Sequence, residues 1–183
     1  MTSPNPDFFV FIDIETTGLD PHFNVPLEVA LLLVDPHTGK TQGFLHVLCD
    51  DDKKRYTVRI SDFCTQMHLE SGLLGELKEH GGRTFDETDQ LLSQFIIQNN
   101  AHGSTLAGNS VHFDRGFINA YFPRTAAILH YRNMDTSSLE RLIHEAGLKL
   151  DFEKPTNHRA MDDINYSARV YKTALALMAC AEC

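Results

Sequence analysis

The chain has 183 residues, of which 42% are hydrophobic and 22% are charged, a composition typical of one globular domain. Its formal net charge of −9 argues against a broad basic groove for long nucleic acids, although short ones held through metal ions remain possible. Its apolar runs are too short to span a membrane, and its first residues lack the basic segment of a secretory signal. We therefore expect a cytoplasmic protein without membrane contacts.

The first half of the chain predicts a hairpin of strands followed by helices. Apolar runs predict strands at residues 8–15, 27–34 and 41–48, with turn residues at 35–40. Residues 50–55 are expected to form an exposed loop, followed by helices at 60–67, 70–79 and 84–100. The segment TFDE gives the third helix a capping box with Thr84 as its N-cap.

In the second half of the chain, predicted strands alternate with predicted helices. Strands are predicted at 104–108 and 128–134, and helices at 112–121, 135–147 and 157–178. Early strands followed by this alternation indicate an α/β domain with a mixed sheet. We predict a single domain over residues 8–178, with tails at 1–7 and 179–183.

Two acids stand at the end of the first predicted strand, in FFVFIDIETTGLD (residues 8–20). Asp13 and Glu15 share one strand face with Phe9 and Phe11, because strand side chains alternate. Neighbouring buried carboxylates repel each other and lose hydration. The pair is either the polar end of a strand entering a loop or part of a site that compensates its charge.

Further acids lie near predicted helix starts. Asp114 falls in the first turns of the helix at 112–121, and His158, Asp162 and Asp163 fall at the start of the last helix. If Asp13, Glu15, Asp114 and Asp163 converge, their oxygens suit divalent cations such as Mg²⁺ or Mn²⁺. Two such ions can bracket a phosphodiester, and a neutral histidine can take the proton of the attacking water.

Three segments resemble the motifs of a known family. The runs at Asp13–Leu19 (D-I-E-T-T-G-L), Asn109–Asp114 and His158–Asp163 are similar to the three exonuclease motifs of the DEDDh 3′→5′ exonucleases. AGNSVHFDRGFI (107–118), HYRNMDTSSL (130–139) and HRAMDDI (158–164) resemble oligoribonucleases more narrowly. The resemblance extends from residue 8 to about residue 172. It implies a ribonuclease-H-like fold, a mixed β-sheet flanked by helices, and removal of 5′-mononucleotides from the 3′ end of short RNAs.

The resemblance also implies roles for the acids and the histidine. Matching positions make Asp13, Glu15, Asp114 and Asp163 the ligands of two divalent metal ions, Mg²⁺ or Mn²⁺, and His158 the general base. The register H-x-A-x-x-D favours Asp163 over its neighbour Asp162, which is expected to face solvent or cap the turn.

Two apolar residues match positions that contact bases in the family. Leu19 matches a leucine that wedges between the two bases of a dinucleotide, and Phe63 stands where a tryptophan usually stacks. Core packing is the alternative for both side chains.

A further set matches the family's phosphate pocket and subunit contact. Ser110, Arg132, Ser137 and Ser138 correspond to a pocket that caps the 5′ phosphate and limits substrate length. The two serines after Asp135 also suit the cap of a helix, and the run DTSSLERL differs from the usual one. Tyr131 matches a tyrosine that reaches the active site of the other subunit, which implies a homodimer.

Three functions follow from these observations. The first is a metal-dependent hydrolase, a 3′→5′ exoribonuclease acting on single-stranded RNAs of a few residues, dinucleotides above all. The second is a DEDDh exonuclease acting on longer single-stranded DNA or RNA, in proofreading or end-trimming. The third is a catalytically silent nucleic-acid-binding subunit, which the presence of all four acids and the histidine disfavours.

Overall fold

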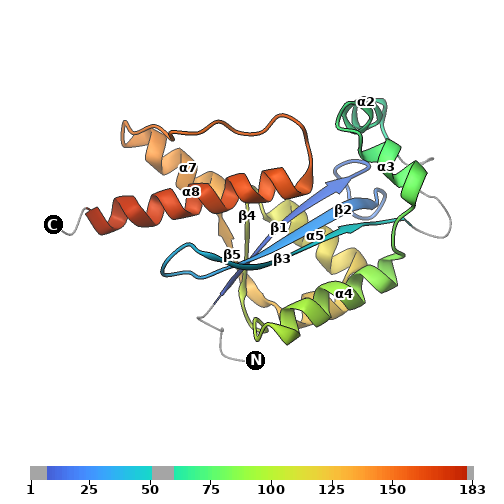
Figure 1. Ribbon diagram of the computed structural model, residues 1–183, viewed down its shortest axis with the longest axis horizontal. Coiled ribbons are helices and arrows are strands. Elements are labelled where there is room, and N and C mark those ends of the chain that lie inside the picture. Colours follow the sequence, from blue (N-terminus) through green and yellow to red (C-terminus); the bar gives the residue numbers. More distant parts are fainter. Residues whose placement is uncertain (1–7, 51–59, 181–183) are drawn as a thin grey trace.

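In the computed structural model, which describes residues 8–50 and 60–180, β1 (Phe9–Thr16) lies at the centre of a five-stranded sheet (Figure 1). The strand order is β3-β2-β1-β4-β5, with β2 at Pro26–Val34, β3 at Thr41–Leu48, β4 at Thr105–Gly108 and β5 at His130–Asp135. The pairs β1–β2 and β2–β3 are antiparallel, whereas β4 runs parallel to both β1 and β5. The predicted mixed sheet is therefore confirmed.

Helices connect and cover these strands. They are α2 (Asp62–Glu70), α3 (Leu73–His80), α4 (Phe85–Gln98), α5 (His112–Tyr121), α6 (Pro123–Ile128), α7 (Thr136–Glu145) and α8 (Ala160–Cys180). The predicted capping box is present, because the Thr84 hydroxyl accepts from the Glu87 N–H while Glu87 accepts from the Thr84 N–H. The loop predicted at residues 50–55 lies outside the described residues from position 51 onward.

One helix was not predicted, and several predicted bounds differ from the structure, that of the last helix most consequentially. The segment before β5 contains α6, which starts directly at Pro123, because proline fits the first helical position, where its missing N–H is not needed. The last helix starts at Ala160 rather than at residue 157, because His158 has a φ of 47° and lies in the left-handed region. His158 therefore stands in the turn before α8.

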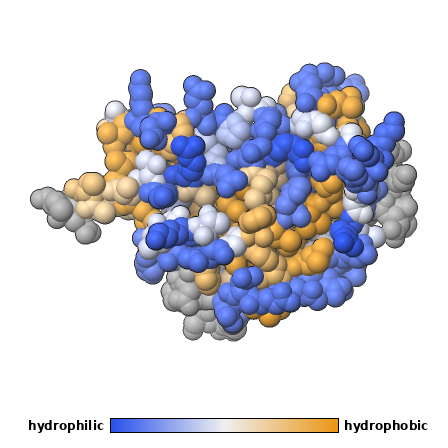
Figure 2. Space-filling model, viewed as in Figure 1, coloured by the Kyte–Doolittle hydropathy of each residue, from blue (hydrophilic) through white to orange (hydrophobic). Residues whose placement is uncertain are grey.

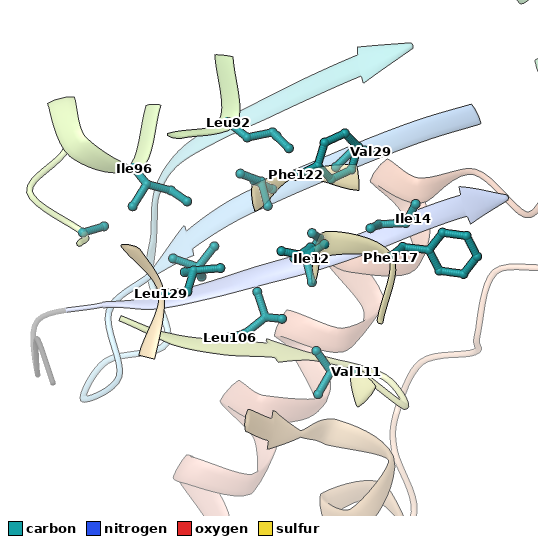
Figure 3. Packing of buried hydrophobic residues seen from close by; sticks show 14 of the residues in the cluster. Ile12, Ile14, Val29, Leu92, Ile96, Leu106, Val111, Phe117, Phe122 and Leu129 are labelled. Carbon is teal, nitrogen blue, oxygen red and sulfur yellow. The ribbon is translucent and has the colours of Figure 1, made fainter. Parts of the chain in front are cut away.

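The two faces of the sheet have separate hydrophobic cores. Ile12 and Ile14 of β1 point to the face covered by α4 and α5, where Phe117 and Leu92 pack against them (Figure 3). Phe11 points to the opposite face, which α8 and α7 cover through residues such as Ile164 and Leu139. Because strand side chains alternate, Asp13 and Glu15 share the α8 face with Phe11.

The surface of the molecule is mixed in polarity. Figure 2 shows hydrophilic residues around an apolar area that lies over the middle of this view, where Figure 1 shows the strands. Within the described residues, none of the helices is both long and apolar enough to cross a bilayer.

Candidate active site

The end of β1 carries the first two acids of the candidate site. Asp13 is half-buried and Glu15 is buried, with 9% of its surface exposed. In the antiparallel pairing of β1 and β2, Glu15 lies directly opposite another acid, Glu28, which is fully buried. Three carboxylates therefore lie near one end of two adjacent strands, where their charges interact.

Asp114 reaches this strand end from the helix after β4. It lies in the first turn of α5, is buried, and its Oδ1 accepts a hydrogen bond of 3.0 Å from the N–H of Ile14. Ile14 stands between Asp13 and Glu15, so this bond fixes Asp114 beside both. At Gly108, which ends β4, a Cβ would lie 2.6 Å from the Ile12 oxygen, so only glycine allows this close approach of the strands.

The start of α8 supplies the last acid and the histidine. Glu15, His158 and Asp163 each offer one ligand atom, and these atoms lie within 4.8 Å of one another. Asp162 is exposed, and its Oδ2 accepts from the Nδ2 of Asn157 at 2.5 Å. Of the two neighbouring aspartates, the structure therefore brings Asp163 to Glu15 and turns Asp162 to the surface.

Electrostatics show that the four acids act on one another. Burial, then repulsion from Asp114, Glu15 and Asp163, raises the pKa of Asp13 well above its usual value. Burial, then repulsion led by Asp163 and Glu28, raises the pKa of Glu15 to about 8. Burial also raises the pKa of Asp114 and of Asp163, against the lowering effect of backbone N–H groups on the first and of Lys154 on the second.

The donor set fits a hard divalent cation. Carboxylate oxygens are the ligands that Mg²⁺ and Mn²⁺ prefer, and the acids raise one another's pKa in addition to the effect of burial. Neither arginine close to these acids in sequence is free to neutralise them: Arg159 forms ion pairs with Glu28 and Glu76, and Arg115 donates to the His130 carbonyl and to Asn133. A bound divalent ion would reverse the penalty that the acids experience without it.

The residues expected to contact bases line one cavity beside the acids. Leu19 is 81% exposed and Phe63 is 76% exposed, so neither packs in the core. Both line a cavity of about 620 Å³ that also includes Glu15, Met67 and Phe113. A smaller cavity of about 270 Å³ links Phe63 with His158. The larger volume lies in the range of small-ligand sites.

Two of the residues expected to cap a 5′ phosphate, Ser110 and Ser137, are hydrogen-bonded to Asp135. Its Oδ1 accepts from the N–H of Ser110 at 3.0 Å and from the N–H and hydroxyl of Ser137 at 2.9 and 2.6 Å. Asp135, not a serine, is the N-cap of α7. Ser138 is exposed in the same turn.

Tyr131 and Arg132 lie on β5, an edge strand of the sheet. Tyr131 is 72% exposed, and the guanidinium of Arg132 donates to its hydroxyl at 3.2 Å. Arg115 of α5 holds this strand in place by donating to the His130 carbonyl and to Asn133. The tyrosine therefore projects from the molecule rather than into its own fold.

Residues without a predicted role also surround the site. His68 is fully buried, its Nε2 lies 2.8 Å from the Thr16 carbonyl oxygen, and its Nδ1 lies 4.0 Å from a Glu15 oxygen. Glu28, which is fully buried, forms an ion pair with the partly exposed Arg159. The sequence carried two weak signals for this pair. Glu28 is a single acid inside the apolar run LEVALLLV, and Arg159 directly follows the motif histidine, His158.

Comparison with solved structures identifies the fold. Escherichia coli exonuclease I in complex with a dT13 oligonucleotide superposes with a TM-score of 0.69 at 16% identity, covering 91% of this chain and 40% of that one. A 3′-exonuclease that recognises the histone mRNA stem-loop superposes with a TM-score of 0.64 at 16% identity, covering 94% of this chain and 65% of that one. The chain thus spans less than half of exonuclease I. The expected ribonuclease-H-like α/β fold is confirmed.

Sequence comparison identifies the family. The profile of the exonuclease family RNase_T matches residues 10–171. The oligoribonuclease of Corynebacterium diphtheriae is 36% identical over 171 residues, which cover 91% of this chain and 80% of the relative. That of Tropheryma whipplei is 32% identical over 165 residues, covering 88% of each chain. The chain belongs to the RNase_T exonuclease family and, within it, to the oligoribonucleases.

Proposed function

We propose that this protein is an oligoribonuclease, a 3′→5′ exoribonuclease that degrades RNAs of a few residues, dinucleotides above all, to 5′-mononucleotides. Family membership supports hydrolytic 3′→5′ exonuclease activity that depends on divalent metal ions. The observation that carries the proposal is the cluster of Glu15, His158 and Asp163 within 4.8 Å, beside a cavity with two exposed apolar side chains.

The residues of the chain divide the chemistry among them. Asp13, Glu15, Asp114 and Asp163 would hold two divalent ions, Mg²⁺ or Mn²⁺, which would supply activation of a water and charge stabilisation for the departing 3′ oxygen. His158 is exposed beside Glu15 and Asp163, where its imidazole takes the proton of the attacking water.

The cavity selects the substrate. Leu19 and Phe63 offer apolar surfaces to the bases, and stacking of this kind tolerates any base sequence. Ser110, Arg132, Ser137 and Ser138 receive the 5′ phosphate, since a guanidinium and hydroxyl groups donate to phosphate oxygens. The Ser137 hydroxyl, which donates to Asp135, has to turn from that carboxylate to do so. A closed 5′ end restricts the enzyme to short substrates.

The active form is a cytoplasmic homodimer. Tyr131 is exposed on an edge strand, so it is free to contact a second copy of the chain. Its ring and Arg132 lie on the same strand, and a tyrosine there adds an apolar surface for a base bound in the partner.

A series of 5′-labelled RNA and DNA oligonucleotides of two to about ten residues tests this function, with rates measured at saturating Mg²⁺ or Mn²⁺. We expect the dinucleotide RNA to be cleaved fastest and chelation of the metal to stop the reaction. Equal rates at all lengths would instead assign the protein to exonucleases of longer single strands. Absence of turnover with either metal would instead favour a catalytically silent nucleic-acid-binding subunit.

A further inference from the structure

Glu28 is a fully buried carboxylate in β2, a strand in which every residue is buried. A buried charge is tolerated only where it is paired and hydrogen-bonded. Glu28 lies opposite Glu15 in the sheet, yet it is not among the residues whose ligand atoms cluster within 4.8 Å. Its burial therefore has to be explained by its own contacts.

Those contacts lead to the turn before α8. Arg159 donates to Glu28 Oε1 from Nε at 3.0 Å and from Nη2 at 2.8 Å, and the N–H of Ala160 donates to Oε2 at 3.0 Å. Glu28 Oε1 also lies 2.6 Å from His46 Nε2 on β3. Arg159 Nη2 makes a second ion pair with Glu76 of α3, at 2.7 Å.

The pair stays charged at neutral pH. Burial alone would raise the pKa of Glu28, but hydrogen bonds from His46, Arg159 and Ala160 lower it to about 2. The same bond to Glu28 raises the pKa of Arg159. A bidentate contact between a guanidinium and a carboxylate fixes orientation as well as distance.

The backbone on both sides of Arg159 belongs to the candidate site, with His158 before it and Asp163 after it. His158 has a φ of 47°, a conformation that costs a non-glycine residue roughly 1 kcal/mol and needs support from its surroundings. The Arg159 carbonyl accepts from the N–H of Asp162 at 3.0 Å and of Asp163 at 3.1 Å, so Arg159 opens α8. Its side chain is anchored in the sheet while its main chain holds Asp163.

We propose that Glu28 and Arg159 are positioning residues of the active site, which hold His158 and Asp163 at working distance from Glu15. Glu15 and Glu28 are paired in the sheet, so an anchor on Glu28 is also an anchor relative to Glu15. This inference rests on the proposed function, because it concerns the same site. Groups that orient metal ligands typically change metal affinity or activity by about 10- to 100-fold when they are removed.

A purely structural ion pair is the competing explanation, and the chain offers a matched control for it. Asp89 of α4 is also fully buried, and it caps a different helix. Its Oδ2 accepts from the N–H of Arg124 and its Oδ1 from the N–H of Thr125, each at 2.9 Å, at the start of α6. Asp89 faces α6, and the residues that donate to its carboxylate, Arg124 and Thr125, lie outside the candidate site.

The experiment compares Arg159→Lys, Arg159→Met and Glu28→Gln with Asp89→Asn. Lysine keeps the charge but loses the fork of donors, so it separates orientation from charge. Each full-length variant is measured for thermal unfolding, for Mn²⁺ affinity by calorimetry without substrate, and for kcat and KM on a dinucleotide well below its Tm. If Glu28→Gln does not fold, the two Arg159 variants still test the proposal, because the Arg159 side chain is partly exposed and its replacement is better tolerated.

We expect Arg159→Met to lower Mn²⁺ affinity or kcat by about 10- to 100-fold with KM nearly unchanged, and Arg159→Lys to lie between it and wild type. Asp89→Asn is expected to lower only the Tm. Folded Arg159 variants with kcat and Mn²⁺ affinity within twofold of wild type would overturn the inference while leaving the function intact. An equal loss of kcat in Asp89→Asn would overturn it too. If wild type itself did not cleave dinucleotides, the proposed function would fail and the Mn²⁺ affinities would still decide the role of the pair.

Discussion

Asn157 and Asp162 are joined by a hydrogen bond of 2.5 Å between Nδ2 and Oδ2 on the surface of the protein. This bond occupies the aspartate that precedes Asp163 and turns it away from Glu15. The two neighbouring acids at the start of α8 therefore lie in different places: Asp163 is within 4.8 Å of Glu15 and His158, and Asp162 is at the surface.

Exchanging each of these aspartates for asparagine separates their roles. Asp163→Asn is expected to lower kcat on a dinucleotide by about 10³-fold, since it removes a metal-binding charge worth several kcal/mol in the transition state. Asp162→Asn keeps a similar shape on an exposed position and is expected to retain most of the activity. Steady-state kinetics of both purified variants checks this, and the opposite order of activities would show that the register is wrong.

The cavity beside the acids predicts the effect of changing Phe63. This ring is 76% exposed, so Phe63→Ala removes a stacking surface without opening a hole in the core. We expect a roughly tenfold increase of KM for dinucleotides, since stacking on an aromatic side chain contributes about 1–3 kcal/mol per base. Phe63→Trp is expected to lower KM, because the indole offers more contact area.

Phe44→Ala is the matched control for this change. Phe44 is 64% exposed on β3 and does not line the cavity. The KM of the Phe44→Ala variant for dinucleotides is expected to equal that of wild type. An unchanged KM in Phe63→Ala would show that Phe63 does not stack on a base of the substrate.

The raised pKa of Glu15 predicts a pH dependence of stability in the metal-free protein. In the unfolded chain this carboxyl loses its proton near its usual value of 4.5, whereas in the folded protein it keeps the proton up to about pH 8. Its contribution to stability is therefore complete below about pH 4.5 and is lost as the pH rises toward 8. The loss amounts to about 1.4 kcal/mol per pH unit in that interval.

Thermal unfolding in the presence of a chelator measures this effect. Wild type is expected to lose stability relative to Glu15→Gln as the pH rises from about 6 to 8, and the difference reports Glu15 together with its effect on Asp13. Added Mg²⁺ is expected to restore wild type at pH 8, because a ligand that binds only the folded state stabilises it. Parallel stability curves for the two proteins would contradict the assigned pKa.

Local patterns predicted most of the fold because they reflect local physics. The alternation around β1, the capping box at Thr84 and the glycine at position 147, with a φ of 76°, all follow from rules that act within a few residues. The helix α6 escaped prediction, since Pro123 marks the end of one helix and the start of another equally well. The left-handed turn at His158 escaped it too, because the next residue, Arg159, is held by Glu28, which is far away in the chain.

The candidate site shows the same division. The spaced motifs predicted which acids belong together, and the structure brings Glu15, His158 and Asp163 within 4.8 Å. The buried contacts of Glu28 and His68 could not be predicted, because they depend on which strands pair and which helix covers them. Residues that support a site through another residue leave little signal in a single sequence.

The last prediction concerns Tyr131, which is 72% exposed on the edge strand β5 and is expected to complete the active site of a second subunit. Tyr131→Ala alone is expected to lower activity while Mn²⁺ affinity stays unchanged, because the acids remain in place. Mixing subunits makes the test decisive. A heterodimer of Tyr131→Ala with Asp163→Asn contains one site with intact acids that receives an intact tyrosine from the Asp163→Asn subunit.

Activity in trans therefore predicts that the mixture regains a substantial part of the rate that each variant has lost alone. Light scattering of the same samples measures whether dimers form. If Tyr131 acted only within its own subunit, one subunit of the mixed dimer would lack the tyrosine and the other an acid, so no rate would return. Full activity of a monomeric wild type would likewise count against the role, because an exposed ring on β5 would then have no partner site to complete.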